Sequence, residues 1–247
     1  MSGTRIGVIG AGVMGSGIAQ TLATAGIPTV CTDIDAAALA RGRETVVSGR
    51  YGLERGVARG KLSREDADAA LARLTFTPSL DEAVACDVVV ECVPERLDLK
   101  LQVFRDLDAR APAATILASN TSGFPITALA AVTSRPDRVI GWHWASPPPV
   151  MRFAEIVVTP KTAAETTARI RELVARAGKN PVVVKDHPTA WGFVANRIYF
   201  AMVQEASRVV EQGIASHEEV NQLMVDCFNW PVGPFAMIRG ATEGWKE

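Results

Sequence analysis

The stretch Arg5-Ile-Gly-Val-Ile-Gly-Ala-Gly-Val-Met-Gly-Ser-Gly-Ile-Ala19 decides how the first part of this chain folds. A short apolar run leads into the pattern Gly10-x-Gly12-x-x-Gly15, and a helical pattern follows. A strand that feeds a helix through this spacing is typical of a dinucleotide-binding turn, in which free N–H groups and the positive end of the helix dipole bind phosphates. We expect the cofactor to contact Gly10, Gly12, Val13, Met14 and Gly15.

An acidic residue follows this turn at about the distance that a dinucleotide site requires, roughly 20 residues. The segment Thr29-Val-Cys-Thr-Asp33 reads as a second strand that ends in a carboxylate. A carboxylate there accepts hydrogen bonds from the ribose hydroxyls and repels a 2′-phosphate, which favours NAD over NADP. The alternative reading is a glycine-rich turn with an unrelated surface aspartate, and we favour the dinucleotide site.

The composition excludes several other classes of protein. The chain has 247 residues, of which 48% are hydrophobic and 21% charged, enough for one large domain or two moderate ones. Its net charge of −1 gives no general attraction to nucleic acid or to an acidic membrane. The sequence shows neither a signal peptide nor an apolar run of the roughly 20 residues that span a bilayer. The four cysteines lack metal-ligand spacing, and we expect a cytoplasmic protein with buried thiols at Cys31 and Cys92.

Apolar strands alternate with helical patterns through the first three quarters of the chain. This alternation predicts a Rossmann-like, doubly wound α/β domain whose mainly parallel sheet is covered on both faces. Besides the first two strands, we expect strands at 74–77, 87–92, 115–119, 138–143, 153–158 and 181–184. We expect helices at 36–59, after the capping sequence at Ser63, at 97–110 with Leu99, Val103 and Leu107 on one face, and at 163–177.

The composition changes at Lys185-Asp-His-Pro188, which is typical of a domain edge. One helix is expected from Phe193 to Gln212, and Ser216 followed by Glu219 predicts the capped start of a second. No strand signal remains after these residues. We therefore expect an NAD-binding domain of residues 1–186 and a smaller, all-helical domain of residues 187–247.

A nicotinamide enzyme needs a group that exchanges a proton with the carbinol oxygen of its substrate, and His143 with Glu155 is the candidate pair. His143 ends one expected strand and Glu155 lies on the next, so adjacent strands could bring the two side chains together. A carboxylate behind an imidazole fixes its tautomer and stabilises the cation that forms when the ring accepts a proton. Spacing alone leaves the alternative equally open, in which both residues are structural.

Seven segments together resemble the L-3-hydroxyacyl-CoA dehydrogenase family over almost the whole chain. In order they are Gly10 to Gly15, Val90 to Glu95 with Lys100, Ser119 to Ser122, Gly141 to Pro147, Met151 to Glu155, Gly192 to Arg197 and Pro231 to Phe235. The resemblance implies an NAD-dependent oxidoreductase of fatty acid metabolism. It would interconvert an L-3-hydroxyacyl thioester of CoA and the 3-ketoacyl thioester by hydride transfer.

The resemblance also implies roles for single residues. His143 matches the general base, and Glu155 matches the carboxylate that orients it. Ser122 and Asn196 match residues near the substrate oxygen. At the nicotinamide end of the cofactor, the matching positions are Glu95, Lys100, Ser122 and Ser146. Taken singly, most of these have simpler explanations, such as a Glu–Lys pair on a helix surface, a turn serine or a polar helix cap.

Three features depart from the family pattern. Ser146 stands where the family usually has an asparagine that contacts the nicotinamide. The segment Pro188-Thr-Ala-Trp-Gly-Phe193 is three residues longer than the usual Pro-Gly-Phe, and it places Trp191 near the expected substrate cleft. Trp191 would shape an acyl pocket or fill the space between domains, and the second reading is slightly favoured. The sequence ends at Trp245-Lys-Glu, where family members usually continue for several helices.

Only two expected helices after residue 187 would leave apolar surface exposed, so we expect a homodimer through this domain. Its interface would bury Trp230, Phe235, Met237 or Trp245. Two other functions stay open: the same fold and residue pair acting on a non-thioester 3-hydroxy acid such as carnitine or gulonate, and a non-catalytic NAD-binding structural protein.

The phosphates of CoA also need cationic partners. Arg50, Arg55 and Arg59 lie on the long helical stretch after Asp33 and could meet them. A solvated basic face explains the same residues equally well.

Overall fold

The computed structural model describes residues 3–243, and the chain divides into two compact units, residues 1–193 and 194–247. The boundary lies beyond the expected one at residue 186. The reason is that Phe193 still packs against the apolar core of the first unit.

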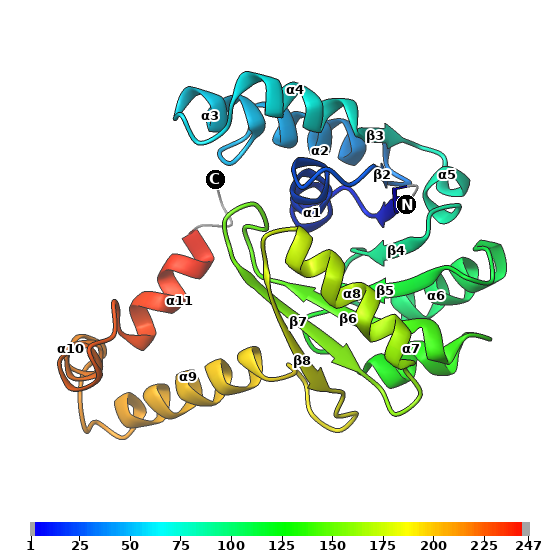
Figure 1. Ribbon diagram of the computed structural model, residues 1–247. Helices are drawn as coiled ribbons and strands as arrows, with labels where there is room; N and C mark the ends of the chain where they lie inside the picture. Colours follow the sequence, from blue (N-terminus) through cyan, green and yellow to red (C-terminus); the bar gives the residue numbers. More distant parts are fainter. Residues whose placement is uncertain (1–2, 244–247) are drawn as a thin grey trace. The chain divides into compact units, whose positions relative to one another are not determined.

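The first unit is built on one eight-stranded sheet with the order β3-β2-β1-β4-β5-β6-β7-β8 (Figure 1). Neighbours from β3 to β6 pair in parallel, β7 is antiparallel to β6, and β8 is parallel to β7. The predicted Rossmann-like, mainly parallel sheet is thus confirmed. The strands are β1 (Ile6–Ile9), β2 (Thr29–Thr32), β3 (Leu74–Thr77), β4 (Val88–Glu91), β5 (Ile116–Ser119), β6 (Val139–Trp144), β7 (Phe153–Val158) and β8 (Asn180–Lys185).

Helices cover both faces of this sheet. On one face, α1 (Val13–Thr24) and α8 (Ala164–Arg176) share a buried cluster with alternate strand residues. On the other face, α5 (Leu80–Val84), α6 (Leu97–Arg110) and α7 (Ile126–Ala131) enclose a second cluster. A short 3₁₀ helix, Pro136–Arg138, leads into β6.

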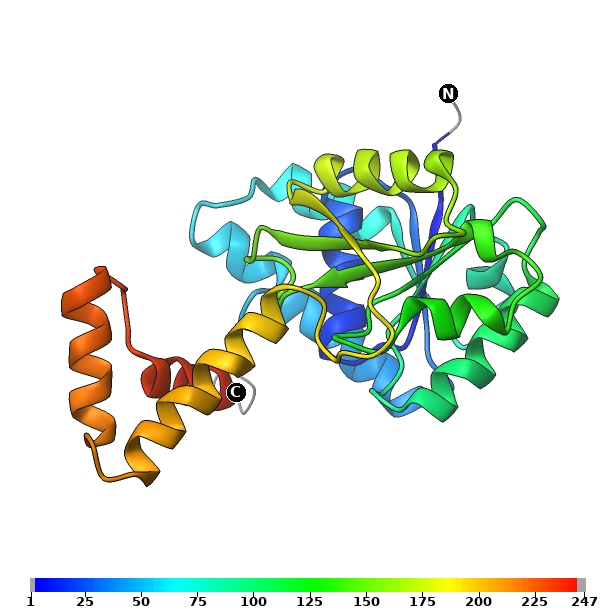
Figure 2. The ribbon, with the colours of Figure 1, turned by 90° about the horizontal axis from the view of Figure 1, so that it is seen from below.

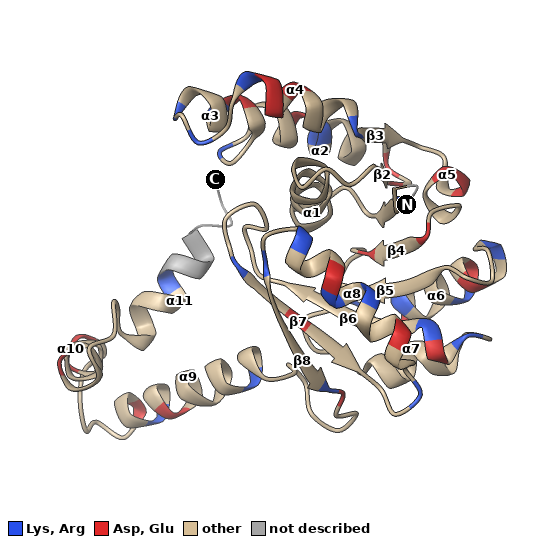
Figure 3. Cartoon of the chain, viewed as in Figure 1, with Lys and Arg blue, Asp and Glu red and all other residues tan. Residues whose placement is uncertain are grey.

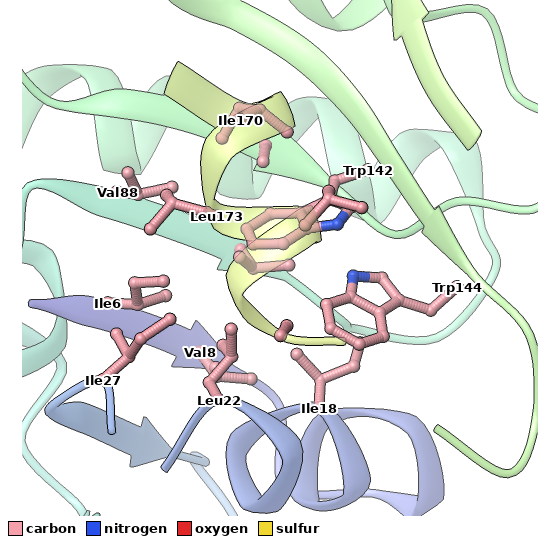
Figure 4. Close-up of a cluster of buried hydrophobic side chains, with 14 of the residues drawn as sticks. Ile6, Val8, Ile18, Leu22, Ile27, Val88, Trp142, Trp144, Ile170 and Leu173 are labelled. Atoms are coloured by element: carbon pink, nitrogen blue, oxygen red, sulfur yellow. The ribbon is translucent and has the colours of Figure 1, made fainter. Parts of the chain in front are cut away.

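The side chains of β6 point alternately to the two faces of the sheet, and this alternation decides on which face His143 lies. Figure 4 shows Trp142 and Trp144 of β6 in the first cluster, close to Ile18 of α1 and Leu173 of α8. Because successive side chains of a strand point to opposite faces, His143 lies on the face of the second cluster.

The helices that follow β2 form a separate layer with mixed charges. The three helices are α2 (Ala36–Ser48), α3 (Leu53–Ala58) and α4 (Arg64–Ala72), and they enclose a third apolar cluster. Figure 3 shows charges of both signs on them. The expected single helix over 36–59 is wrong, because α2 ends at Ser48, before Gly49, and α3 begins after Gly52. A Cβ on Gly52 would lie 2.8 Å from the backbone of both Gly49 and Val47, so the tight turn between the helices requires glycine.

Three helices, not the expected two, make up the described part of the second unit (Figure 2). They are α9 (Ala195–Glu211), α10 (His217–Phe228) and α11 (Pro234–Glu243). The predicted cap of α10 is confirmed, since the Ser216 side chain and the Glu219 side chain each bond the other's backbone N–H. The proline that begins α11 suits a first helical position, where no N–H is needed. Trp245, expected in an interface, lies outside the described residues.

Candidate active site

The β1–α1 turn has the shape that a dinucleotide requires. Gly10 has a φ of 101°, in the region that favours glycine. A Cβ on Gly15 would lie 1.8 Å from the carbonyl oxygen of Gly10, so only glycine allows this helix to approach the strand. Nothing lies within 4 Å of the Cβ position of Gly12, which leaves its backbone open to a phosphate. Val13 and Met14 follow in the first turn of α1.

Asp33 follows the end of β2 and is held by two backbone N–H groups. Its Oδ2 accepts a hydrogen bond from Ala11 N at 2.8 Å, and its Oδ1 accepts one from Asp35 N at 2.9 Å. The first bond ties the carboxylate to the glycine turn. A carboxylate has about four lone-pair positions, so this one retains acceptor capacity for ribose hydroxyls. The residues present therefore fit NAD.

His143 and Glu155 are brought into contact by the antiparallel pairing of β6 and β7. The two residues are directly opposite in the register. His143 Nδ1 lies 2.8 Å from Glu155 Oε2, and the residues are only 6% and 3% exposed. Because an ionised carboxylate can only accept, the proton of this bond belongs to Nδ1, and Nε2 is left as the basic nitrogen. Phe153 packs edge-on against the imidazole at a centroid distance of 5.3 Å.

A buried ionic network lies at the carboxyl end of β4. Lys100 Nζ donates to Glu91 Oε1 at 2.7 Å and to the carbonyl oxygen of Val93 at 3.1 Å, and it lies 3.2 Å from Glu95 Oε2. Burial raises the pKa of Glu91 against the opposing effect of Lys100. Burial would lower the pKa of Lys100, but the charges of Glu91 and Glu95 outweigh it and raise that pKa. The lysine is thus held as a cation.

The same network extends to the loop after β5. Ser119 Oγ donates to Glu91 Oε2 at 2.6 Å, and Thr121 Oγ1 donates to Glu95 Oε1 at 2.6 Å. Ser122 N donates to Glu95 Oε1 at 2.9 Å. Glu95 therefore fixes the backbone of Ser122 at the same edge of the sheet as the glycine turn.

Two residues of this network lie where their sequence positions do not suggest. A lysine on one helix surface is the simple explanation of Lys100, whereas its side chain is 1% exposed and reaches into the interior. Glu91 was not singled out as a site residue, although a carboxylate that ends the apolar run Val88-Val-Val-Glu91 signals a buried partner.

The remaining predicted residues lie on loops or in the second unit. Ser146 lies in the loop between β6 and β7, which Lys179 fastens by donating to the carbonyl oxygens of Pro148 and Met151 at 2.6 and 2.7 Å. Asn196 lies in the first turn of α9, in the second unit.

A basic pocket of about 600 Å³ opens elsewhere on the first unit. Its described lining includes no carboxylate but seven cationic side chains, among them the three arginines singled out in the sequence: Arg50, Arg55, Arg59, Lys61, Arg152, Arg176 and Lys179. Such a lining suits a polyanion, because one arginine guanidinium can donate two parallel hydrogen bonds to the oxygens of a phosphate.

Two kinds of feature are absent from the part of the chain that the structure describes. No group of histidine, cysteine and carboxylate side chains there could hold a metal ion. No helix there combines the length and apolar character that crossing a membrane takes.

Two domains of one enzyme family match successive parts of the chain. The NAD binding domain of 3-hydroxyacyl-CoA dehydrogenase matches residues 5–187, and the C-terminal domain of 3-hydroxyacyl-CoA dehydrogenase matches residues 192–245.

Three individual proteins have similar sequence identities to this chain. A probable 3-hydroxybutyryl-CoA dehydrogenase of Bacillus subtilis is 39% identical over 94% of this chain and 79% of its own length. A 5-formyl-3-hydroxy-2-methylpyridine 4-carboxylate 5-dehydrogenase of Mesorhizobium japonicum is 38% identical over 93% of this chain and 71% of its own. The crystal structure of (S)-3-hydroxybutyryl-CoA dehydrogenase from Ralstonia eutropha superposes with a TM-score of 0.90 at 42% identity, over 96% of this chain and 81% of that one.

Proposed function

The chain belongs to the 3-hydroxyacyl-CoA dehydrogenase family of NAD-dependent oxidoreductases, and we propose that it interconverts an L-3-hydroxyacyl-CoA and the 3-ketoacyl-CoA with His143 as the acid–base group. The observation that carries this proposal is the buried His143–Glu155 pair, at the sheet edge where the glycine turn and Asp33 also lie. The names of the similar proteins support the substrate class.

In this mechanism the chain's residues move one proton. Bound NAD would supply the hydride acceptor for C3 of the substrate. His143 Nε2 takes the hydroxyl proton, and the carboxylate of Glu155 stabilises the imidazolium that results. In the reverse direction the imidazolium returns the proton to the carbonyl oxygen. Ser122 donates a hydrogen bond to the same oxygen, with its backbone held by Glu95. Asn196 is also proposed to contact this oxygen.

At the cofactor, Gly10, Gly12, Val13, Met14 and Gly15 would hold the pyrophosphate, and Asp33 the ribose. Glu95 and Ser146 are proposed for the nicotinamide end. Lys100 acts there through Glu95, because its own side chain is buried beneath that carboxylate.

Turnover of acetoacetyl-CoA with NADH tests the proposal, followed as the loss of NADH absorbance. We expect turnover with the thioester and none with the free acid. The relative named for a pyridine substrate supports one other function, an oxidoreductase for a non-thioester substrate on the same residues. Activity on such compounds without activity on any thioester would favour that function.

The basic pocket is the proposed site for the phosphates of CoA. Arg55→Ala and Arg59→Ala should raise the KM for acetoacetyl-CoA with little change in kcat. The matched control is acetoacetyl-N-acetylcysteamine, a thioester without phosphates, whose KM should not change. An equal rise for both substrates would contradict this assignment.

A homodimer through the second unit is also proposed. Apolar side chains exposed on its helices and loops support this, each at least 43% exposed: Val194, Ile198, Phe200, Ile214, Leu223, Phe228 and Val232.

A further inference from the structure

The segment after β8 is fastened to α7 and to the loop that carries Ser122. At its start, Asp186 Oδ2 accepts a hydrogen bond from Thr127 N at 2.7 Å. Near its end, a Cβ on Gly123 would lie 2.3 Å from Gly192 N and 2.7 Å from two ring atoms of Trp191. The indole of Trp191 therefore packs directly on Gly123, the residue after Ser122.

The same segment reaches the acid–base pair. The ring of Phe193 lies 5.9 Å from the imidazole of His143, centroid to centroid. Two residues earlier, Trp191 is 45% exposed although it is fixed against Gly123. A large, partly exposed apolar side chain is thus fixed against the residue that follows Ser122, and both belong to the first unit.

We propose that Trp191 is a specificity-determining residue, whose indole contacts the acyl chain beyond C3 and limits its length. This proposal rests on the proposed function, in which Ser122 binds the oxygen on C3. The substituent of C3 must then lie close to that serine, and Trp191 is the large apolar side chain fixed next to it. A longer chain would have to displace an indole that is held by backbone contacts, and excluding even one methylene group changes kcat/KM by about 10-fold or more.

The experiment compares kcat/KM for a four-carbon and an eight-carbon 3-ketoacyl-CoA. We expect the wild-type chain to favour the shorter substrate. Trp191→Ala should raise the ratio of the eight-carbon to the four-carbon value about 10-fold. Trp191→Phe, which retains an aromatic ring against Gly123, should give a smaller rise. Thr189→Ala is the matched control in the same segment, since its hydroxyl contacts His187 Nδ1 at 3.1 Å, and it should leave the ratio unchanged.

A second variant moves the indole without altering it. Gly123→Ala forces Trp191 and Gly192 away, so it should change the ratio in the same direction, and the double variant with Trp191→Ala should add little more.

The outcomes separate this proposal from the proposed function. An unchanged ratio in Trp191→Ala, or an equal fall in kcat/KM for both substrates, would mean that the indole only fills space, and would overturn the proposal. A wild-type chain that turns over no 3-ketoacyl-CoA overturns both, and that failure is visible before any variant is made.

Discussion

Lys100 and Glu91 form an ion pair in the interior, with side chains 1% and 0% exposed. Removing one partner of a buried pair leaves an uncompensated charge and costs about 3–5 kcal/mol. We expect Lys100→Met to lower the free energy of unfolding by about that amount, measured by urea denaturation.

The second partner supplies the control. Glu91→Gln in the same chain removes the orphaned charge, so the double variant should be less destabilised than the sum of the single ones. Simple additivity would show that the two groups do not interact.

His143 carries the chemical prediction at the residue scale. His143→Ala should lower kcat about 10²- to 10⁴-fold, because the proton acceptor is lost, while NADH binding measured by fluorescence stays unchanged. Glu155→Gln should also lower kcat, since the imidazolium loses its charge partner. His187→Ala, outside the site, is the control. Near-normal turnover of thioesters by His143→Ala would contradict the mechanism.

Asp33 is expected to set the cofactor preference. Because its carboxylate would repel a 2′-phosphate, NADH should give a far higher kcat/KM than NADPH, and Asp33→Ala should narrow that difference. Asp35→Ala removes the side chain that caps α2, and it should leave the preference for NADH unchanged. Equal values for both cofactors in the wild-type chain would refute the role given to Asp33.

The positions of some of these site residues could be predicted from the sequence, and those of others could not. Strand spacing showed only that His143 and Glu155 could meet, and the observed register of β6 and β7 places them directly opposite each other. The burial of the Lys100 side chain could not be predicted from the sequence. A lysine on a helix usually points to solvent, and only the fold places Glu91 beneath it. The sequence predicts Trp191 near the substrate cleft, but its contact with Gly123 depends on the path of an irregular segment and could not be predicted.

At the scale of elements, the end of α6 is held by one arginine. The guanidinium of Arg135 donates to the carboxylate of Asp108 at 2.7 Å and to the carbonyl oxygens of Asp108, Ala111 and Pro112. The Asp108 carbonyl lies in the last turn of α6, where the backbone N–H groups of the helix no longer reach, so Arg135 caps the C-terminus of α6.

This clamp predicts a dependence of stability on pH. Burial would raise the pKa of Asp108, but hydrogen bonds from Ser134 N and Arg135 outweigh it and lower that pKa below its usual value of 3.8. A carboxylate whose pKa is lowered by folding stabilises the fold above its unfolded pKa, and this contribution is lost as the pH falls through the folded pKa. Asp108→Ala should therefore cost about 1–3 kcal/mol at neutral pH, and less once the pH has fallen below the lowered pKa of Asp108 in the folded protein.

Another aspartate of α6 provides the comparison. Asp98 pairs with Arg96 on the surface, where both side chains are about two-thirds exposed or more. Asp98→Ala should change the free energy of unfolding much less than Asp108→Ala does, because solvent screens an exposed ion pair. Equal losses in the two variants at every pH would show that the Asp108 clamp contributes nothing specific.

Most elements of the first unit could be predicted from periodicity, because each strand or long helix carries its own apolar pattern. The helix α6 was predicted with its observed bounds, although its buried face centres on Lys100, Phe104 and Leu107 rather than on Leu99 and Val103. The helices α5, α7 and α11 were missed, and α5 and α7 have only five and six residues. Helices this short are stabilised by packing rather than by their own propensity, so the sequence gives little sign of them.

At the scale of the whole molecule, the order of an α/β unit followed by a helical unit could be predicted. What packs against the apolar faces of the helices in the second unit could not. Its helix α9 has one buried side chain, Ala206, among the described residues. Local patterns show that a helix is amphipathic, yet they do not show what packs on its apolar face.

We expect a second copy of the chain to cover that face. Exposed apolar side chains such as Ile198 and Leu223 would meet across a two-fold axis, the commonest symmetry of oligomers. Ile198→Asp and Leu223→Asp should therefore yield monomers, because each places a charge in the interface. Light scattering at micromolar concentration measures the mass directly. Val182→Asp, on the exposed edge strand β8, is the matched control and should remain a dimer. A wild-type monomer would refute the dimer, and a dimer broken by Val182→Asp alone would assign the interface to the first unit instead.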